Sequence, residues 1–178
     1  MKDNNTAEGL NVKTINGKHG SFQVLRVYIP KFSKWIEENK HLLQPPVSNK
    51  NLYIDSGDYI VMIVGGPNAR KDYHYNESEE LFYQLEGDIT VKVQLDGKAQ
   101  EIQIKEGEMF LLPGNIPHNP MRGPNTVGLV IEKVRKGTDL IDGLMWFCEQ
   151  CNHPLQSYRF PLSNIENDFL PRFKEFYG

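Results

Sequence analysis

The stretch ITVKVQLDGKAQEIQI, residues 89–104, decides the fold. Apolar residues alternate with polar ones in both halves, and the Asp96-Gly97 pair between them is a favoured two-residue turn of a β-hairpin. Such alternation is typical of strands that have one buried face and one solvated face. The stretch therefore predicts two antiparallel strands at the centre of the chain.

Further apolar segments on both sides of this hairpin repeat the strand signal. Residues 59–64 form a continuous apolar run of the kind found in buried strands, and turn signals recur roughly every 8–12 residues. Six or more short strands in this arrangement predict a sandwich or a closed barrel. The other expected strands are 81–85, 110–112 and 127–134, and residues 22–29 could form an edge strand.

Helical signals lie near the two ends of the chain. Residues 32–43 fit a short amphipathic helix, which Pro45 and Pro46 must end because proline cannot continue a helix. Residues 169–177 could form a terminal helix or an arm packed on the barrel.

The domain organisation is simple. No internal repeat divides the 178 residues, so we expect one folded domain over residues 22–178, with a barrel core at about 50–136. The polar residues 1–21 lack periodicity, and we expect a disordered arm or a segment added for expression.

Composition and charge argue against several classes of partner. The net charge of −3 disfavours nucleic acid and anionic membranes, since binding phosphate requires concentrated lysine and arginine. No stretch approaches the ~20 apolar residues of a membrane-spanning helix, and the first residues contain no apolar signal core. We therefore expect a cytoplasmic protein.

Two segments that flank the hairpin carry candidate metal ligands. GGPNARKDYHYNESEELFYQLEG, residues 65–87, contains His74 and Glu80, and GEMFLLPGNIPHNPMR, residues 107–122, contains His118. Adjacent strands that each contribute one inward side chain can bring such ligands together in a barrel. Two imidazoles and one carboxylate form the facial triad that holds non-heme Fe(II) and leaves positions open. A lone histidine is more often a surface or core residue, but that alternative leaves the bracketing glycines and prolines unexplained.

This layout resembles the cupin superfamily, whose two motifs run G…H-x-H…E…G and G…P…H across a jelly-roll barrel. Asn76 stands where the first motif has its second histidine, which leaves three ligands in place of four. The resemblance implies an all-β, single-domain cupin with a short N-terminal helix and a C-terminal extension. The matching residues are Gly66, His74, Glu80, Gly87, Gly107, Pro113 and His118.

The residues between the motifs resemble one family in particular, the 3-hydroxyanthranilate 3,4-dioxygenases. The similarity is carried by GGPNARKDYH, EELFYQLEG, FLLPGNIPHNPMR and VIE, includes QPPVSN, and runs to WFCEQC. Membership implies Fe²⁺, a homodimer, and ring opening of 3-hydroxyanthranilate by both atoms of dioxygen. The implied product is 2-amino-3-carboxymuconate semialdehyde, which leads from the tryptophan–kynurenine route to quinolinate and NAD.

The same resemblance assigns roles to individual residues. Glu132 is expected to take or relay the proton of the substrate hydroxyl, as a general base. Arg70 is placed both at the substrate and beside the dioxygen site. The implied iron ligands are His74, Glu80 and His118, and the implied substrate contacts are Arg70, Arg122, Glu132 and Asn49.

The chemistry of the residues supports the arginines and the glutamate. Arg70 precedes His74 by four residues and Arg122 follows His118 by four, so on strands each arginine would share a face with a ligand. A guanidinium can hold a carboxylate through two parallel hydrogen bonds, although either arginine alone could be a solvated surface charge. Glu132 lies among valines, and a carboxylate in an apolar stripe is costly unless it is paired. An arginine-lined pocket is therefore favoured over an exposed face.

Cys148 and Cys151, the only two cysteines, form a C-x-x-C pair. In a reducing compartment such a pair indicates metal binding or redox chemistry before a structural disulfide. Bacterial and fungal members of the resembled family carry two such pairs, which form a second iron site remote from catalysis. Two thiolates cannot complete a tetrahedral site. We expect this second metal site to be incomplete and empty, or weakly held with help from His153, and two reduced surface thiols are the alternative.

Two other functions remain compatible with the sequence. One is a cupin dioxygenase that acts on another ortho-aminophenol or a catechol. The other is a metal-binding or ligand-sensing cupin without turnover, which would keep the pocket residues but consume no oxygen.

Overall fold

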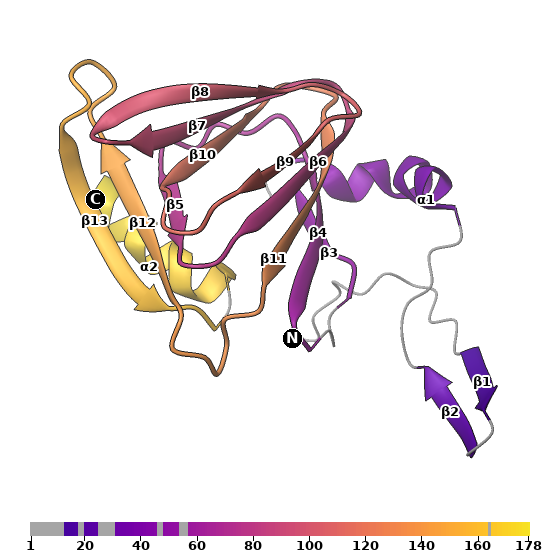
Figure 1. Cartoon of the computed structure of the whole chain (residues 1–178). Helices are drawn as coiled ribbons and strands as arrows, with labels where there is room; N and C mark the ends of the chain where they lie inside the picture. The colour runs from indigo at the N-terminus through magenta and orange to yellow at the C-terminus, as the bar shows by residue number, and fades with distance from the viewer. Residues whose placement is uncertain (1–12, 18–19, 25–30, 46–47, 54–56, 164) are drawn as a thin grey trace.

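Two antiparallel β-sheets that face each other form the body of the protein (Figure 1). The computed structural model describes residues 13–17, 20–24, 31–45, 48–53, 57–163 and 165–178. In spatial order, the six-stranded sheet contains β13 (Pro154–Pro161), β12 (Ile141–Phe147), β5 (Tyr73–Asn76), β10 (His118–Arg122), β7 (Ile89–Leu95) and β8 (Lys98–Ile104). The five-stranded sheet contains β3 (Asn49–Asn51), β4 (Tyr59–Gly65), β11 (Val127–Lys133), β6 (Glu80–Glu86) and β9 (Met109–Leu112).

The inner faces of the two sheets meet in one apolar core. The five-stranded sheet contributes Met62, Phe82 and Val130, and the six-stranded sheet contributes Val91 and Val93 among others. These side chains alternate with outward-facing residues, as the strand period of two requires. Fully burying an apolar side chain of this size stabilises a fold by about 1.5–3 kcal/mol, so the predicted alternation supplies the main driving force.

The central hairpin has the geometry that its sequence predicts. β7 pairs with β8 from Ile89 opposite Ile104 to Leu95 opposite Lys98, which leaves Asp96 and Gly97 as the turn. Both turn residues have positive φ, 50° at Asp96 and 72° at Gly97. This is the mirror-image turn that matches the twist of paired strands, and glycine adopts it without steric cost.

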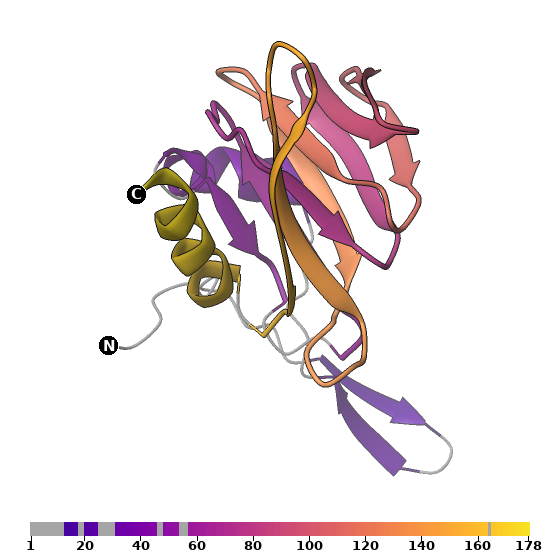
Figure 2. The same ribbon diagram turned by 90° about the vertical axis from the view of Figure 1, so that its left-hand side faces the viewer.

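Two helices cover parts of the sandwich (Figures 1 and 2). α1 (Phe32–Asn39) and the 3₁₀ turn η1 (Lys40–Leu43) bury Ile36 and Leu43 against the five-stranded sheet. α2 (Ile165–Tyr177) packs on β12 and β13, where Trp146 is the largest buried side chain. The short N-terminal helix predicted from the sequence is therefore confirmed, and a terminal helix forms in place of an extended arm.

The predicted fold class, an all-β cupin sandwich with a short N-terminal helix and a C-terminal extension, is confirmed. The six-stranded sheet continues beyond residue 136 through β12 and β13. β1 (Lys13–Gly17) and β2 (Gly20–Val24) form a hairpin that projects from the sandwich in both views (Figures 1 and 2). Residues 1–12, and 25–29 of the expected edge strand, lie outside the described residues. None of the described helices has the length and apolar character needed to span a bilayer.

Candidate metal centre

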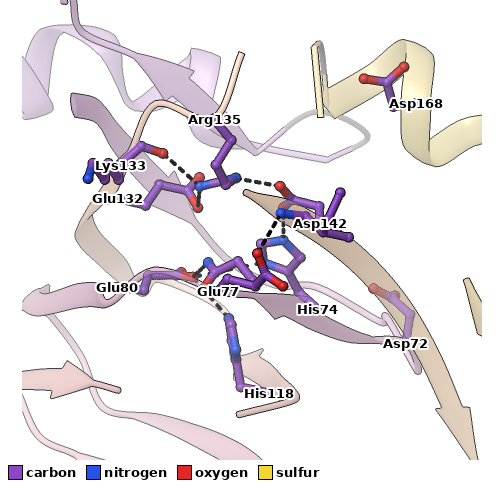
Figure 3. A network of polar contacts seen from close by, with 12 residues as sticks. Asp72, His74, Glu77, Glu80, His118, Glu132, Lys133, Arg135, Asp142 and Asp168 are labelled. Carbon is purple, nitrogen blue, oxygen red and sulfur yellow. Dashed lines mark hydrogen bonds and ion pairs between the residues drawn. The ribbon is translucent and has the colours of Figure 1, made fainter. Parts of the chain in front are cut away.

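The three predicted metal ligands meet inside the sandwich (Figure 3). His74 on β5 and His118 on β10 are direct cross-strand partners in the six-stranded sheet. Glu80 is the first residue of β6, in the opposite sheet, and its side chain points at both imidazoles. All three side chains are buried, so the hairpin that joins the two motifs brings residues far apart in sequence into one enclosed site.

The distances fit a site for a single ion. Nε2 of His118 lies 3.0 Å from Oε2 of Glu80, and Nδ1 of His74 lies 3.8 Å from the same oxygen. The two imidazole centroids are 5.2 Å apart at an angle of 65°. One donor atom from each residue falls within 4.8 Å of the others, and no other group of three possible ligands exists among the described residues. The geometry therefore allows one ion to contact all three.

The hydrogen bonds around the triad leave two ring nitrogens available for a metal. Nδ1 of His118 donates to the carbonyl oxygen of Ile116 at 3.0 Å, while its buried Nε2 faces only Oε2 of Glu80, the third candidate ligand. Nε2 of His74 bonds Asp142 at 2.7 Å. A group that is hydrogen-bonded to one ring nitrogen of a histidine orients the imidazole, so that the other ring nitrogen can bind a metal. Two nitrogens and a carboxylate oxygen suit a divalent transition metal, so the residues fit the predicted ion.

Asn76 does not replace the missing fourth ligand. Its amide nitrogen donates to Oε2 of Glu80 at 3.2 Å. An amide N–H₂ group has donors only, so this contact orients the carboxylate and leaves the metal three protein ligands.

Electrostatics keep Glu80 ionised. Burial alone raises the pKa of Glu80, but His118, His74 and Arg135 outweigh the burial and lower this pKa to about 2. Burial lowers the pKa of His118, but the Glu80 charge and the Ile116 carbonyl raise it overall. In the metal-free protein a proton can thus occupy the space between His118 and Glu80, which is the position that a cation takes.

Arg122 is a buried cation that makes no ion pair within the described ranges. It ends β10 with its side chain on the same inner face as His118, so Pro120 does not disturb the strand parity. Its Nη1 donates to Oε1 of Gln84 at 3.3 Å, and its Nε has no partner. Burial, reinforced by the charge of Arg70, lowers the pKa of Arg122 to about 10. A buried guanidinium with an unused donor is well prepared to receive an anion.

Gly128 makes room for this guanidinium in the opposite sheet. A Cβ atom at Gly128 would lie 2.8 Å from Nη1 of Arg122 and 2.7 Å from Oε1 of Gln84, closer than real side chains approach. Asn49 lies in the same cross-strand row, because Asn49 pairs with Val64 and Val64 pairs with Gly128. Cross-strand partners share a face, so Asn49 lies on the inner face two strands from Gly128, at roughly 10 Å.

Arg70 lies close to the centre but holds a protein carboxylate. It precedes β5, so the argument that it shares a strand with His74 is wrong. Its Nε and Nη2 both bind the buried carboxylate of Asp72. Burial lowers the pKa of Arg70, but Asp72, with Glu80 and Glu132 farther away, raises it overall. Arg70 is therefore a fixed positive charge near the triad.

Glu132 faces the interior, beside the metal ligands. It is the cross-strand partner of Glu80, and its Oε2 accepts a hydrogen bond from Nη1 of Arg135 at 2.8 Å. Burial raises the pKa of Glu132 and the charge of Glu80 raises it further, while Arg135 and His74 oppose them. A carboxyl group with a raised pKa next to a metal site is suited to proton transfer.

Three residues at the site were not singled out from the sequence. Arg135 and Asp142 are both buried and bind each other, Nε to Oδ2 at 2.5 Å. Phe169 of α2 lies against His74, with ring centroids 5.5 Å apart, and closes that side of the site. Asp142 could have been found, because a carboxylate inside the apolar run LIDGLMWF carries the same signal as Glu132.

The two cysteines lie in the turn between β12 and β13, away from the triad. The turn is closed by hydrogen bonds from the Cys148 amide to the His153 carbonyl and from the Asn152 amide to the Cys148 carbonyl. Both cysteines are free thiols. The backbone amides of Cys151 and Gln150 lower the pKa of Cys148. The turn therefore favours the thiolate form of Cys148. In the described part of the chain, no third metal ligand lies beside the two cysteines.

An antiparallel β-sandwich with two imidazoles and one carboxylate converging in its interior defines the class of this molecule as an all-β protein with a candidate site for one divalent metal ion. Residues 24–177 match a family model described as 3-hydroxyanthranilic acid dioxygenase. The chain belongs to this family.

Two curated relatives from other organisms support this membership. The chain is 56% identical over 143 residues to a 3-hydroxyanthranilate 3,4-dioxygenase from Xanthomonas oryzae pv. oryzae, covering 80% of each chain. It is 48% identical over 145 residues to one from Neurospora crassa, covering 82% of this chain and 79% of the relative. Among solved structures, a cupin-2 domain protein from Shewanella frigidimarina is 21% identical and covers 56% of this chain and 92% of that chain, with a TM-score of 0.46.

Proposed function

We propose that this chain is a 3-hydroxyanthranilate 3,4-dioxygenase that uses non-heme Fe(II). The reaction breaks a carbon–carbon bond of the aromatic ring and adds both atoms of dioxygen, giving 2-amino-3-carboxymuconate semialdehyde on the route from tryptophan to quinolinate and NAD. The relatives that carry this name support the substrate assignment. The observation that carries the proposal is the buried His74–Glu80–His118 triad beside the buried Arg122, which makes no ion pair in the described ranges.

Arg122 is the proposed receptor for the substrate carboxylate. A buried positive charge without a counter-ion is costly, and an anionic substrate supplies the missing partner. Arg70 adds a second positive charge near the triad, where the family resemblance also places the dioxygen site, although Asp72 already neutralises it in part. Asn49 is proposed to line the same cavity from β3. This arrangement selects an aromatic acid over a neutral aminophenol.

Glu132 is the proposed general base. Its carboxyl lies beside Glu80 and is oriented by Arg135, so it is close to the place where the substrate hydroxyl would lose its proton. Burial and the charge of Glu80 raise its pKa, so this carboxylate accepts a proton more readily than an exposed one does.

His74, Glu80 and His118 are proposed to hold the ferrous ion. When bound, Fe(II) supplies a centre with open positions at which the substrate and dioxygen can meet. Phe82 and Phe169 pack against the two imidazoles, Phe82 on His118 and Phe169 on His74, and exclude water from that side.

Activity tests the function directly. Protein loaded anaerobically with Fe(II) should, after addition of 3-hydroxyanthranilate and air, consume dioxygen and produce the absorbance of the ring-opened product. Protein loaded with Zn(II) should bind metal without turnover, because zinc has no redox chemistry. Oxygen uptake only with a catechol or another ortho-aminophenol would move the assignment to a different dioxygenase, and metal binding without any uptake would indicate a non-catalytic cupin.

We also propose that Cys148 and Cys151 are not required for catalysis. The double change to serine should leave iron content and turnover per iron within about twofold, because two thiolates cannot complete a tetrahedral site. Any effect should appear as a shift in the unfolding temperature, since a structural metal acts on folding. The measurements are iron content, turnover and thermal unfolding of the double variant. Loss of turnover at unchanged iron and unchanged stability would place the cysteines in the active site.

Assembly into a homodimer is proposed through the outer face of β9. Met109 and Leu111 alternate on this face and are 62% and 52% exposed. Exposed apolar side chains on neighbouring positions mark interaction surfaces. The changes Met109→Glu and Leu111→Glu together should therefore convert a dimer into monomers in sedimentation, while the exposed control Leu170→Glu should not. A monomeric parent protein, or a dimer that survives both changes, would rule out this interface.

A further inference from the structure

Gln84 is the hydrogen-bond partner of Arg122, and its own orientation is fixed. It shares the inner face of β6 with Glu80, and its side chain is buried. Its Nε2 donates to the carbonyl oxygen of Glu86 at 2.8 Å. A carbonyl oxygen only accepts, so Nε2 must turn toward Glu86 and Oε1 toward Arg122, where it lies 3.3 Å from Nη1. Gln84 therefore offers the guanidinium an acceptor that carries no charge.

The two arginines of the site differ in the charge of their partners. Arg70 is held by the buried carboxylate of Asp72. Arg122 is held by an amide, and within the described part of the chain its buried Nε has no hydrogen-bond partner. A carboxylate beside a guanidinium balances its charge, whereas an amide oxygen satisfies one of its five N–H groups and leaves the charge unbalanced. The site thus keeps one guanidinium available for an anion from outside the protein.

Gly128 provides the space in which Gln84 and Arg122 meet. It lies on β11 directly opposite Gln84, while Arg122 reaches the same place from β10 in the facing sheet (Figure 1). A Cβ atom at Gly128 would lie 2.7 Å from Oε1 of Gln84 and 2.8 Å from Nη1 of Arg122. Contacts this short force the neighbours to shift, so any side chain at this position would displace the pair.

We propose that Gln84 is a specificity-determining residue, because its neutral amide positions Arg122 without neutralising it. A glutamate at position 84 would form a buried ion pair with Arg122 and would take the place of the substrate carboxylate. It would also lose the donor that binds the Glu86 carbonyl. The site would then favour a neutral ortho-aminophenol over an aromatic acid. This role of Gln84 rests on the proposed recognition of the substrate carboxylate by Arg122.

Ligand binding tests this role without turnover. Calorimetry on the metal-loaded protein, without dioxygen, gives the Kd of 3-hydroxyanthranilate and of 2-aminophenol, which lacks the carboxylate. The parent protein should bind the acid more tightly. In Gln84→Glu the affinity for the acid should fall roughly ten- to a hundredfold, as for the loss of a charge-assisted hydrogen bond, while the affinity for 2-aminophenol should change by less than about threefold.

Two further variants separate the effect of charge from that of packing. Gln84→Met keeps much of the side-chain volume but loses the amide oxygen, so it should weaken binding of the acid by only about two- to tenfold and should keep the preference for the acid. Gln103→Glu makes the same change of charge on β8, where the exposed Gln103 donates to Thr90, and should alter the binding of neither ligand. Metal content and thermal unfolding of each variant accompany these measurements.

The ratio of the two affinities distinguishes a role in specificity from a structural one. Equal losses for both ligands in Gln84→Glu, or an unchanged preference for the acid, would overturn the role of Gln84. If Gln84→Glu does not fold, Gln84→Met decides, because a loss confined to the acid supports the role, whereas a loss shared by both ligands, or no loss, overturns it. A parent protein that binds both ligands equally would instead contradict the recognition of the carboxylate by Arg122, and with it the proposed substrate.

Discussion

Replacement of His118 by alanine should abolish both stoichiometric metal binding and turnover. The change removes Nε2, the buried nitrogen that lies 3.0 Å from Oε2 of Glu80, and it leaves the ion two protein ligands. We expect the affinity for metal to fall by at least about a hundredfold, since groups that only orient a ligand already cost roughly 10–100-fold. Metal content after dialysis and oxygen uptake measure the two effects.

His41→Ala is the matched control for this change. His41 is an exposed histidine in η1, so its loss removes the same chemical group from the surface and should change neither metal content nor turnover. Thermal unfolding of the His118 variant must accompany these measurements, because the change also removes the positive partner of the buried Glu80 and the hydrogen bond to the Ile116 carbonyl. Full metal occupancy in folded His118→Ala would contradict the assignment of this ligand.

Replacement of Arg122 by methionine should weaken binding of 3-hydroxyanthranilate while leaving the metal in place. Methionine keeps much of the side-chain volume but has no donors, so the substrate carboxylate would lose its charge-assisted hydrogen bond. Such a bond is worth roughly 1.5–3 kcal/mol, so its loss should raise the KM for 3-hydroxyanthranilate about ten- to hundredfold or more. Steady-state kinetics and metal content of the variant measure the result.

Two comparisons isolate the carboxylate in this experiment. The analogue 2-aminophenol lacks the carboxylate, so Arg122→Met should change its kinetics little. Arg159→Met removes an exposed guanidinium that stacks on Tyr75 and should leave both substrates unaffected. Equal losses for 3-hydroxyanthranilate and 2-aminophenol in Arg122→Met would mean that Arg122 does not recognise the carboxylate.

Local patterns in the sequence were enough to predict the centre of the fold and the triad. The β7–β8 hairpin follows from alternation and an Asp-Gly turn, both of which involve only neighbouring residues. The ligands follow from motifs whose residues keep their spacing on either side of this hairpin. The offset of four residues between His118 and Arg122 also survives, because β10 stays regular through Pro120.

Other features could not be predicted from the local pattern of residues. β13 is an edge strand whose residues are mostly exposed, so its sequence PLQSYRFP shows no alternation of buried and exposed positions. The partner of Glu132 is Arg135, three residues along the chain, and not Arg70 or Arg122. Arg70 lies in an irregular segment, where a spacing of four residues does not determine which way a side chain points.

The placement of the triad across both sheets has a consequence for how the molecule holds together. Two ligands belong to the six-stranded sheet and one to the five-stranded sheet, so a bound ion fastens the two layers to each other as a removable crosslink. The ligands converge only after strands far apart in the chain have paired, so the unfolded chain offers the ion no comparable site. Mass action then ties the free energy of unfolding to the metal supply, by about 2.7 kcal/mol at a free metal concentration one hundred times the Kd. Scarcity of the bound metal would thus lower the resistance of this protein to unfolding and proteolysis as well as its catalytic capacity.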